Sequence, residues 1–264
     1  MAELPTFRFG GRVTDAELAF YEEYGFIVYR GMVAPEEVAV LSEDADHYQR
    51  RVLAGTVASE HVDTVAPVTK DENGTPKRYH RLNYVTQYCE RSRDILRAER
   101  FALLGRAFAG PSSWLLEDTM NGVVWQHKTG GTSSAYGAIR WHLDFPAGHP
   151  LSPVVTVGIY LDDSTRSNGC LAVIPKSHRY PIGVCAPEPV YLEVAVGDVI
   201  CHHERIYHGS DPMPDPSGHR ATIYLYFCAG AYPGHGLPFA DTKRLKSVQK
   251  LFVGSGEHGM EPER

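Results

Sequence analysis

The stretch IRWHLDFP, residues 139–146, carries a histidine and an aspartate two positions apart in an otherwise apolar and aromatic run. In a β-strand, side chains at positions i and i+2 point to the same face. His142 and Asp144 would therefore project together, whereas Trp141 and Leu143 would point the other way into the packing of the protein. Two side chains that bind metals, held side by side on a rigid strand, make a good partial metal site.

The spacing by itself is weak evidence, because the chain contains 13 histidines and a second pair of the same spacing occurs at His61 and Asp63. The neighbours of that second pair are small, polar and turn-forming, so no strand is expected to hold its two side chains together. We therefore expect a metal at the first pair and not at the second.

A third ligand is available in the region 197–229, where His208 ends a strand-like run just before a glycine. Two neutral imidazoles and one carboxylate on one face of a metal leave three positions open, which is the arrangement of non-haem Fe(II) oxygenases. A 2-oxo acid fills two of these positions, and the far carboxylate of a dicarboxylic oxo acid then needs a cation. Arg220, at the start of the next expected strand, offers a bidentate guanidinium for that carboxylate.

The N-terminal third of the sequence reads as mostly helical. Its apolar side chains recur at helical steps, and a capping box at Thr14 and Glu17 opens the first helix. A short β-rich run, FIVYR, follows that helix. The expected helices cover about 15–24, 35–52 and 90–108.

After Pro111 the pattern changes to short β-rich segments separated by clusters of glycine, proline, asparagine and aspartate. No helical periodicity lies between these segments, so the strands are expected to be antiparallel with hairpin-like connections. Seven or more such strands favour a sandwich or a jelly roll. The expected strands cover roughly 113–127, 138–145, 153–161, 170–174, 190–195, 198–202 and 220–229.

The chain contains no internal repeat, low-complexity tract or convincing linker, so we expect one domain over residues 1–264. This domain would consist of an N-terminal helical part at about 1–112, a β core at about 113–230 and a C-terminal helix at about 241–252.

The bulk composition limits the class of protein. A net charge of −6 and a pI near 6.1 argue against a general nucleic-acid binder. No apolar run approaches the roughly 20 residues that cross a bilayer, and the opening residues lack the plan of a secretory signal. The five cysteines form no CxxC pair. We expect a reduced, cytoplasmic protein that acts on a small molecule, without nucleic-acid or membrane partners; its oligomeric state does not follow from the sequence.

Several stretches together make the chain resemble the phytanoyl-CoA dioxygenase family of Fe(II)- and 2-oxoglutarate-dependent oxygenases, which includes ectoine hydroxylase. In chain order they are QHKTGG, IRWHLDF, NGCLAVIPKSH, VGDVICHHERIYHGS and the arginine at position 220. The resemblance spans roughly residues 120–230, and the early YGFIVYRGM run is also similar. Two departures touch no ligand: Lys176 stands where a glycine is frequent, and His202-His203 replaces a more aromatic pair.

The resemblance implies a double-stranded β-helix, the cupin-like form of jelly roll, with iron held by His142, Asp144 and His208. It also implies that Arg220 anchors 2-oxoglutarate with the help of Ser210, and that O2 is the oxidant. Tyr160 occupies a place where some relatives have a tryptophan lining the oxo-acid pocket. Lys128 falls where relatives often carry a lysine near the same pocket.

The implied reaction is oxidation of a C–H bond in a small molecule, with natural-product biosynthesis as the expected context. Halogenating relatives have a small residue in place of the carboxylate, so Asp144 disfavours halogenation. Hydroxylation is the default outcome, while desaturation, ring closure and epoxidation remain alternatives. The metal ligands also fit a zinc-dependent, cupin-like hydrolase or isomerase, and a non-catalytic small-molecule-binding barrel is a third reading.

The basic stretch PKRYHRLNYVTQY, residues 76–88, lies between the second and third expected helices. It reads either as a solvated loop or as a mobile lid over the mouth of the barrel, since long loops in compact domains are often functional or disordered. In the second case Lys77, Arg78 and Arg81 would favour an anionic substrate.

Overall fold

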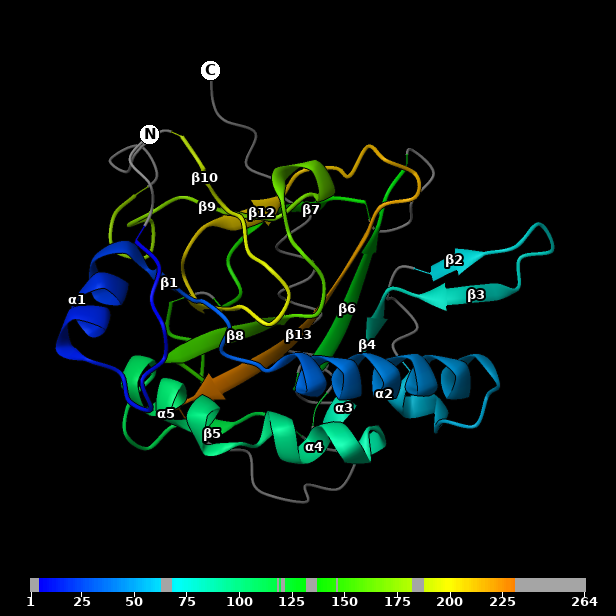
Figure 1. The fold of residues 1–264 in the computed structure, drawn as a ribbon, viewed down its shortest axis with the longest axis horizontal. Coiled ribbons are helices and arrows are strands. Elements are labelled where there is room, and N and C mark those ends of the chain that lie inside the picture. Colours follow the sequence, from blue (N-terminus) through cyan, green and yellow to red (C-terminus); the bar gives the residue numbers. More distant parts are fainter. Residues whose placement is uncertain are drawn as a thin grey trace.

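The computed structural model describes residues 5–62, 68–117, 119, 122–131, 137–145, 147–181 and 188–230. Two antiparallel β-sheets face each other, and helices cover the outer side of the larger one (Figure 1). The larger sheet has the order β1 (Phe26–Tyr29), β11 (Val199–His203), β8 (Val154–Tyr160), β13 (His219–Cys228), β6 (Val124–Thr129) and β4 (Arg81–Leu82), and β5 (Trp114–Leu115) also pairs with β13.

The smaller sheet has the order β10 (Val190–Leu192), β9 (Leu171–Val173), β12 (His208–Ser210) and β7 (Ile139–His142). A separate hairpin consists of β2 (Val68–Lys70) and β3 (Pro76–Tyr79). Neighbouring strands of the two larger sheets pair antiparallel. This confirms the predicted jelly roll of antiparallel strands.

The helices are α1 (Asp15–Tyr24), α2 (Pro35–Leu53), α3 (Val85–Tyr88), α4 (Glu90–Leu96) and α5 (Glu99–Phe108), with two short 3₁₀ turns at Ser59–His61 and Arg166–Asn168. The predicted capping box is present at the start of α1, where the Thr14 hydroxyl accepts a hydrogen bond from the Glu17 amide. Gly25 ends α1 in the left-handed conformation, with φ of 83°.

Several predictions about the elements and their boundaries were wrong. The helix predicted at 90–108 is broken between α4 and α5, where Ala98 is extended. In one continuous helix, Leu96 and Phe101 would point about 140° apart, and the break lets both be fully buried. The segment predicted as one strand at 113–127 forms two strands, and residues 76–88 contain β3, β4 and α3 instead of an open loop. The C-terminal helix expected at 241–252 lies outside the described residues.

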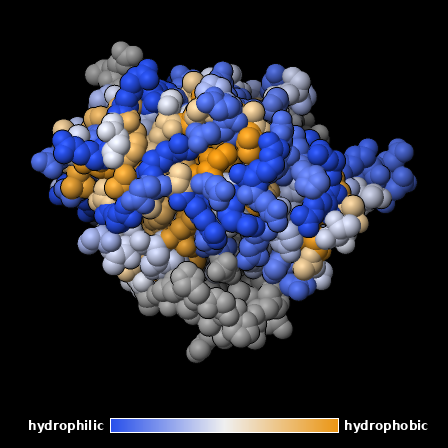
Figure 2. Space-filling view, turned by 60° about the horizontal axis from the view of Figure 1, so that its bottom comes forward, coloured by the Kyte–Doolittle hydropathy of each residue, from blue (hydrophilic) through white to orange (hydrophobic). Residues whose placement is uncertain are grey.

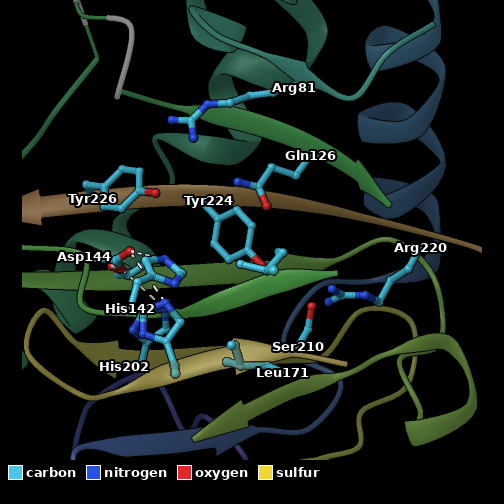
Figure 3. Close-up of a pocket in the computed structure, with 14 residues that line it drawn as sticks. Arg81, Gln126, His142, Asp144, Leu171, His202, Ser210, Arg220, Tyr224 and Tyr226 are labelled. Atoms are coloured by element: carbon cyan, nitrogen blue, oxygen red, sulfur yellow. Dashed lines mark hydrogen bonds and ion pairs between the residues drawn. The ribbon is translucent and has the colours of Figure 1, made fainter. Parts of the chain in front are cut away.

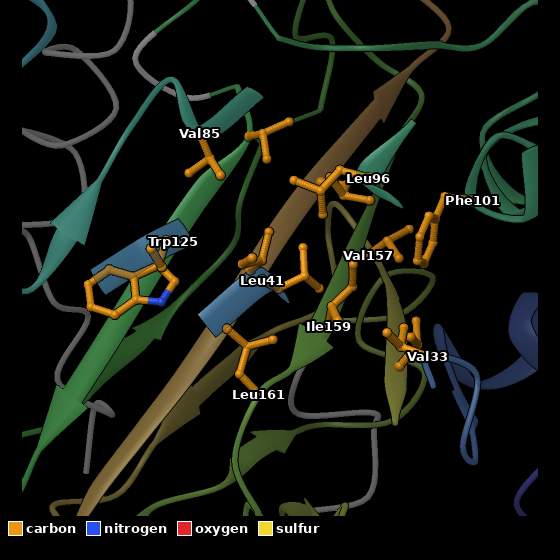
Figure 4. Packing of buried hydrophobic residues seen from close by; sticks show 14 of the residues in the cluster. Val33, Leu41, Val85, Leu96, Phe101, Trp125, Val157, Ile159 and Leu161 are labelled. Atoms are coloured by element: carbon orange, nitrogen blue, oxygen red, sulfur yellow. The ribbon is translucent and has the colours of Figure 1, made fainter. Parts of the chain in front are cut away.

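The main hydrophobic core lies between the helices and the outer face of the larger sheet (Figure 4). Leu41 of α2, Leu96 of α4 and Phe101 of α5 pack with side chains of β6 and β8. The other face of the same sheet contributes polar and aromatic side chains to the space between the sheets. Because side chains alternate along a strand, one face of the larger sheet packs in the core and the other faces the space between the sheets.

Hydrophilic side chains cover most of the face shown in Figure 2, with smaller groups of hydrophobic residues between them. Within the described part of the chain, no helix combines the length and the apolar character that a bilayer crossing requires. The cysteines described, Cys89, Cys170, Cys201 and Cys228, are buried and unbridged.

The buried and exposed leucines of α2 give a direct test of this packing. Leu41 is fully buried, whereas Leu53 of the same helix is 38% exposed. We expect Leu41→Ala to lower the free energy of unfolding by about 2–5 kcal/mol, because it leaves a cavity in the core. Leu53→Ala should change it by about 0.5 kcal/mol or less. Urea unfolding followed by tryptophan fluorescence measures both, and equal effects would contradict the packing described.

Candidate active site

The three predicted metal ligands converge between the two sheets (Figure 3). The Nε2 atoms of His142 and His208 lie 3.7 and 3.6 Å from Oδ1 of Asp144. One ligand atom from each residue lies within 4.8 Å of the others. His142 is on β7 and His208 on β12, and the two residues are directly opposite each other in the antiparallel ladder. Two distant segments of the sequence thus supply one cluster.

Backbone carbonyls fix the orientation of both imidazoles. Nδ1 of His142 lies 2.8 Å from the carbonyl oxygen of Arg140, and Nδ1 of His208 lies 2.9 Å from that of Ile206. Since a carbonyl only accepts, each Nδ1 carries the proton and donates it, which leaves the Nε2 lone pair toward the cluster. This is the arrangement that metal-binding histidines adopt.

Asp144 lies just beyond the end of β7, on a bend and not within the strand that we predicted to extend to residue 145. The amides of Asp144 and Phe145 both donate to the carbonyl of Glu204, over 3.0 and 3.2 Å. This bend still directs the carboxylate toward His142. It also turns Leu143 out to 42% exposure, so the prediction that Leu143 packs inside was wrong. Trp141 is half-buried and stacks on Tyr207.

The two oxygens of Asp144 have different surroundings. Oδ1 faces the metal-binding nitrogens, whereas Oδ2 accepts a 2.7 Å hydrogen bond from the hydroxyl of Thr156. Nε2 of a third imidazole, His202, lies 3.8 Å from Oδ2. Thr156 and His202 are opposite each other on β8 and β11. The hydroxyl therefore holds the carboxylate with a single oxygen toward the cluster.

Burial sets the protonation of the cluster. It lowers the pKa of His208 to about 3, which keeps this imidazole neutral. Burial alone would raise the pKa of Asp144, but His208, His142 and His202 outweigh it and hold the pKa below its usual range. A carboxylate beside imidazoles whose Nε2 atoms face it is a donor set for a divalent metal, which binds these ligands in their deprotonated form. The residues present fit an iron ion.

At the other end of the same cavity, Arg220 of β13 presents unsatisfied donors. The residue is only 4% exposed, and within the described part of the chain its Nε and Nη1 have no hydrogen-bond partner. Unpaired donors of a buried guanidinium are costly unless a ligand takes them up. Arg220 and Ser210 both line the cavity that contains the triad. This pair of donors fits the far carboxylate of a dicarboxylic oxo acid.

Lys128 lies behind Ser210 and does not line the cavity itself. Its ammonium donates to the hydroxyl of Ser210 over 2.9 Å and also to the carbonyls of Gly169 and Asp211. Burial and the charge of Arg220 lower the pKa of Lys128 to about 7. A Cβ at Gly169 would lie 2.1 Å from Nζ, so the glycine leaves the room that the ammonium occupies.

Tyr160 is fully buried in the hydrophobic cluster between the sheets and does not line the cavity. The guanidinium of Arg220 lies 5.8 Å from the centre of its ring, which is within cation–π range. The ring of Tyr160 thus stabilises the charge of Arg220.

Of the other histidine–aspartate pair, His61 and Asp63, the aspartate lies outside the described residues. Nδ1 of His61 lies 2.6 Å from the Tyr88 hydroxyl.

The cavity has a volume of about 120 Å³ and joins the triad to Arg220. Sequence reasoning did not single out several residues that line it, because their positions depend on strand pairing. The alternation of Thr222, Tyr224 and Tyr226 along one strand was the signal that could have shown an inward polar face. The missed polar and aromatic lining residues are Gln126, Thr156, His202, Tyr224 and Tyr226.

The hydroxyl of Thr156 can be tested without disturbing the ligands. We expect Thr156→Val to weaken Mn(II) binding by about tenfold to 100-fold, because the carboxylate loses the partner that orients it. Thr222→Val removes a hydroxyl from another buried threonine of the same sheet, one that does not line the cavity, and should leave the affinity unchanged. Calorimetric titration of Mn(II) measures both variants. Unaltered affinity in Thr156→Val would contradict the positioning role.

The chain is similar in sequence to known proteins of one family. The model of the phytanoyl-CoA dioxygenase (PhyH) family matches residues 21–214. A probable alpha-ketoglutarate-dependent hypophosphite dioxygenase of Stutzerimonas stutzeri is 23% identical over 236 residues, which cover 81% of this chain and 78% of the relative. An ectoine dioxygenase of Streptomyces anulatus is 26% identical over 185 residues, which cover 67% of this chain and 55% of the relative. The matches thus span about half the length of the ectoine dioxygenases.

Solved structures share the fold. AviO1 from Streptomyces viridochromogenes Tue57 superposes with a TM-score of 0.63 at 26% identity, covering 83% of this chain and 96% of that one. EctD from S. alaskensis with bound Fe gives a TM-score of 0.65 at 19% identity, covering 89% and 85%. The second likeness supports the cupin-like double-stranded β-helix alone. Since the family model covers more than half of the chain, the protein belongs to the phytanoyl-CoA dioxygenase family of Fe(II)- and 2-oxoglutarate-dependent oxygenases.

Proposed function

We propose that the protein hydroxylates a C–H bond of a small molecule with Fe(II), 2-oxoglutarate and O2, in the biosynthesis of a natural product. The observation that carries this proposal is the buried Arg220 on the wall of the cavity that holds the triad. Its Nε and Nη1 have no hydrogen-bond partner among the described residues. A hydrolase or isomerase that uses zinc needs no anchor for an oxo acid. The arginine therefore favours the oxygenase over the zinc enzyme that the same ligands would fit.

In this proposal the metal is held by Nε2 of His142, Nε2 of His208 and one oxygen of Asp144. Bound iron supplies the activation of O2 at the expense of 2-oxoglutarate, and this is its part in the reaction. The protein supplies position and charge. Because the hydroxyl of Thr156 holds the second carboxylate oxygen of Asp144, a metal would be bound by the first oxygen alone.

Arg220 and the hydroxyl of Ser210 bind the far carboxylate of 2-oxoglutarate in this proposal. Lys128 fixes the hydroxyl from behind, and the ring of Tyr160 supports the guanidinium. Since these groups are buried, water competes little for the carboxylate, and the ion pair is stronger than it would be at the surface. The substrate then occupies the remaining side of the cavity.

We also propose that the helical N-terminal part and the β core form a single catalytic domain. β1 and β4 come from the N-terminal part, yet both are strands of the larger sheet. α2, α4 and α5 contribute to the same hydrophobic core as β8 and β13. Neither part would bury its apolar surface without the other.

The activity is tested by formation of succinate from 2-oxoglutarate with purified protein, Fe(II) and ascorbate, across a panel of small molecules. We expect O2-dependent succinate formation that a substrate stimulates, with a hydroxylated product by mass spectrometry. Activity that persists without O2 and is restored by zinc would overturn the proposal in favour of a hydrolase or isomerase.

Arg220→Gln tests the anchor. We expect the affinity for 2-oxoglutarate to fall by about tenfold to 100-fold, because a charged hydrogen-bond pair is lost, while Mn(II) binding remains unchanged. Arg91→Gln is the matched control, since its side chain is 57% exposed and pairs with Glu43 on a helix. Calorimetric titration of the Mn(II)-loaded proteins measures both, and equal affinities in the two variants would refute the assignment of Arg220.

A further inference from the structure

The three cations of the basic stretch 76–88 have separate places in the structure. Lys77 is exposed on β3. The guanidinium of Arg78 lies 3.2 Å from Nδ1 of His127 and lines a different hollow from that of the triad. Arg81 alone of the three lines the cavity that contains the metal ligands. Of these three cations, Arg81 is therefore the one that contributes to the site.

Strand pairing explains why Arg81 points inward. β4 pairs with β6 so that Arg81 is opposite Gln126 and Leu82 is opposite Trp125. Directly opposite residues share a face of the sheet, and successive residues alternate between faces. Leu82 and Trp125 belong to the hydrophobic core, so Arg81 and Gln126 must face the cavity, as both do.

The position of the guanidinium separates it from the oxo-acid anchor. In the view of Figure 3, Gln126 and Tyr224 lie between Arg81 and Arg220, and Arg81 lies on the side of Tyr226. Tyr226 is opposite Thr156, the residue that orients the carboxylate of the triad. Arg81 and Arg220, the proposed anchor of the co-substrate, thus lie on different sides of the metal ligands.

The Arg81 guanidinium is restrained at the wall of the cavity. Its Nε donates to Oδ1 of Asn83 over 3.1 Å, which restrains the orientation of its plane.

The lining of the cavity favours an anion. Among the described residues that line it, the charged ones besides the histidines are Arg81, Arg220 and Asp144, so cations outnumber carboxylates. In the proposed function, Asp144 binds the metal and Arg220 binds 2-oxoglutarate. Arg81 has no part in either of these two bindings, and its charge adds to that of the lining.

We infer that Arg81 is a substrate-binding residue that takes up an oxyanion group of the substrate, either a carboxylate or a phosphorus oxyanion, beside the amide of Gln126. The planar guanidinium offers two parallel donors to either group. The substrate would run from this oxyanion past Tyr224 and Tyr226 to the metal. The inference rests on the proposed function and names the chemical class of its substrate.

The test measures binding without turnover. Protein loaded with Mn(II) and saturated with 2-oxoglutarate is titrated with acetate, methylphosphonate or neutral acetamide, and the relaxation of the methyl protons reports on approach to the metal. We expect at least one of the two anions to bind more tightly than acetamide. The stronger anion distinguishes a carboxylate substrate from a phosphonate-like one.

The variants identify the residue responsible. In Arg81→Gln the affinity for the favoured anion should fall by about tenfold, to the level of acetamide. Arg81→Lys should retain part of it, because the charge remains without the paired donors. Lys77→Gln removes the same charge from an exposed position nearby and should behave as the wild type. Thermal melting and the affinity for 2-oxoglutarate verify that each variant is folded.

Three results would overturn the inference and leave the proposed function standing. These are equal binding of the anions and acetamide, wild-type anion binding in Arg81→Gln, and a loss of 2-oxoglutarate affinity in folded Arg81→Gln, which would assign the arginine to the co-substrate. If the wild-type protein bound Mn(II) but not 2-oxoglutarate, the proposed function itself would fail, and the inference with it.

Discussion

The carboxylate of Asp144 is the group on which the site depends. It is a buried anion, and a buried anion is stable only with partners that match its charge and its lone pairs. The protein supplies the amide-to-carbonyl contacts to Glu204 that fix its backbone, the Thr156 hydroxyl that holds one oxygen, and imidazoles around the other. Imidazoles that bind a metal are neutral and do not balance the charge of the carboxylate, and a divalent metal between the imidazoles and the carboxylate would.

The larger sheet makes this environment possible because its two faces have separate tasks. The odd-numbered residues of β8, such as Val157 and Ile159, pack against the helices, while Thr156 faces the site. On β13 the same alternation sends Leu225 to the core and Tyr224 to the cavity. Rigid packing on one face therefore fixes the geometry on the other, and binding groups on paired strands are held more accurately than groups on loops.

The positions of the charged residues along the cavity match the binding roles that we propose for them. Arg220 with Ser210 and Lys128 forms one positive end, the triad forms the centre, and Arg81 adds a second positive position reached from another direction. A co-substrate with two carboxylates and a substrate with one oxyanion could then bind together without exchanging places. Such separation gives specificity as well as affinity, because each anion meets its own cation near the metal.

Much of this protein could be predicted from the sequence, because short-range pattern is enough to locate its elements. The capping box and apolar stripe predicted α1 and α2, the β-rich segments predicted the jelly roll, and the motifs singled out His142, Asp144, His208 and Arg220. Element ends were less predictable: the break before α5 and the bend at Asp144 arise from tertiary packing, which overrides local propensity.

Tertiary structure alone decided which side chains meet. That Thr156 holds Asp144, that Lys128 supports Ser210 from behind, and that Arg81 faces the cavity while Arg78 does not all depend on strand register. The sequence determined which residues alternate along each strand, but not which strands pair or in which register. A shift of one residue in β4 would exchange the faces of Arg81 and Leu82, and the packing of Leu82 and Trp125 in the core opposes that shift.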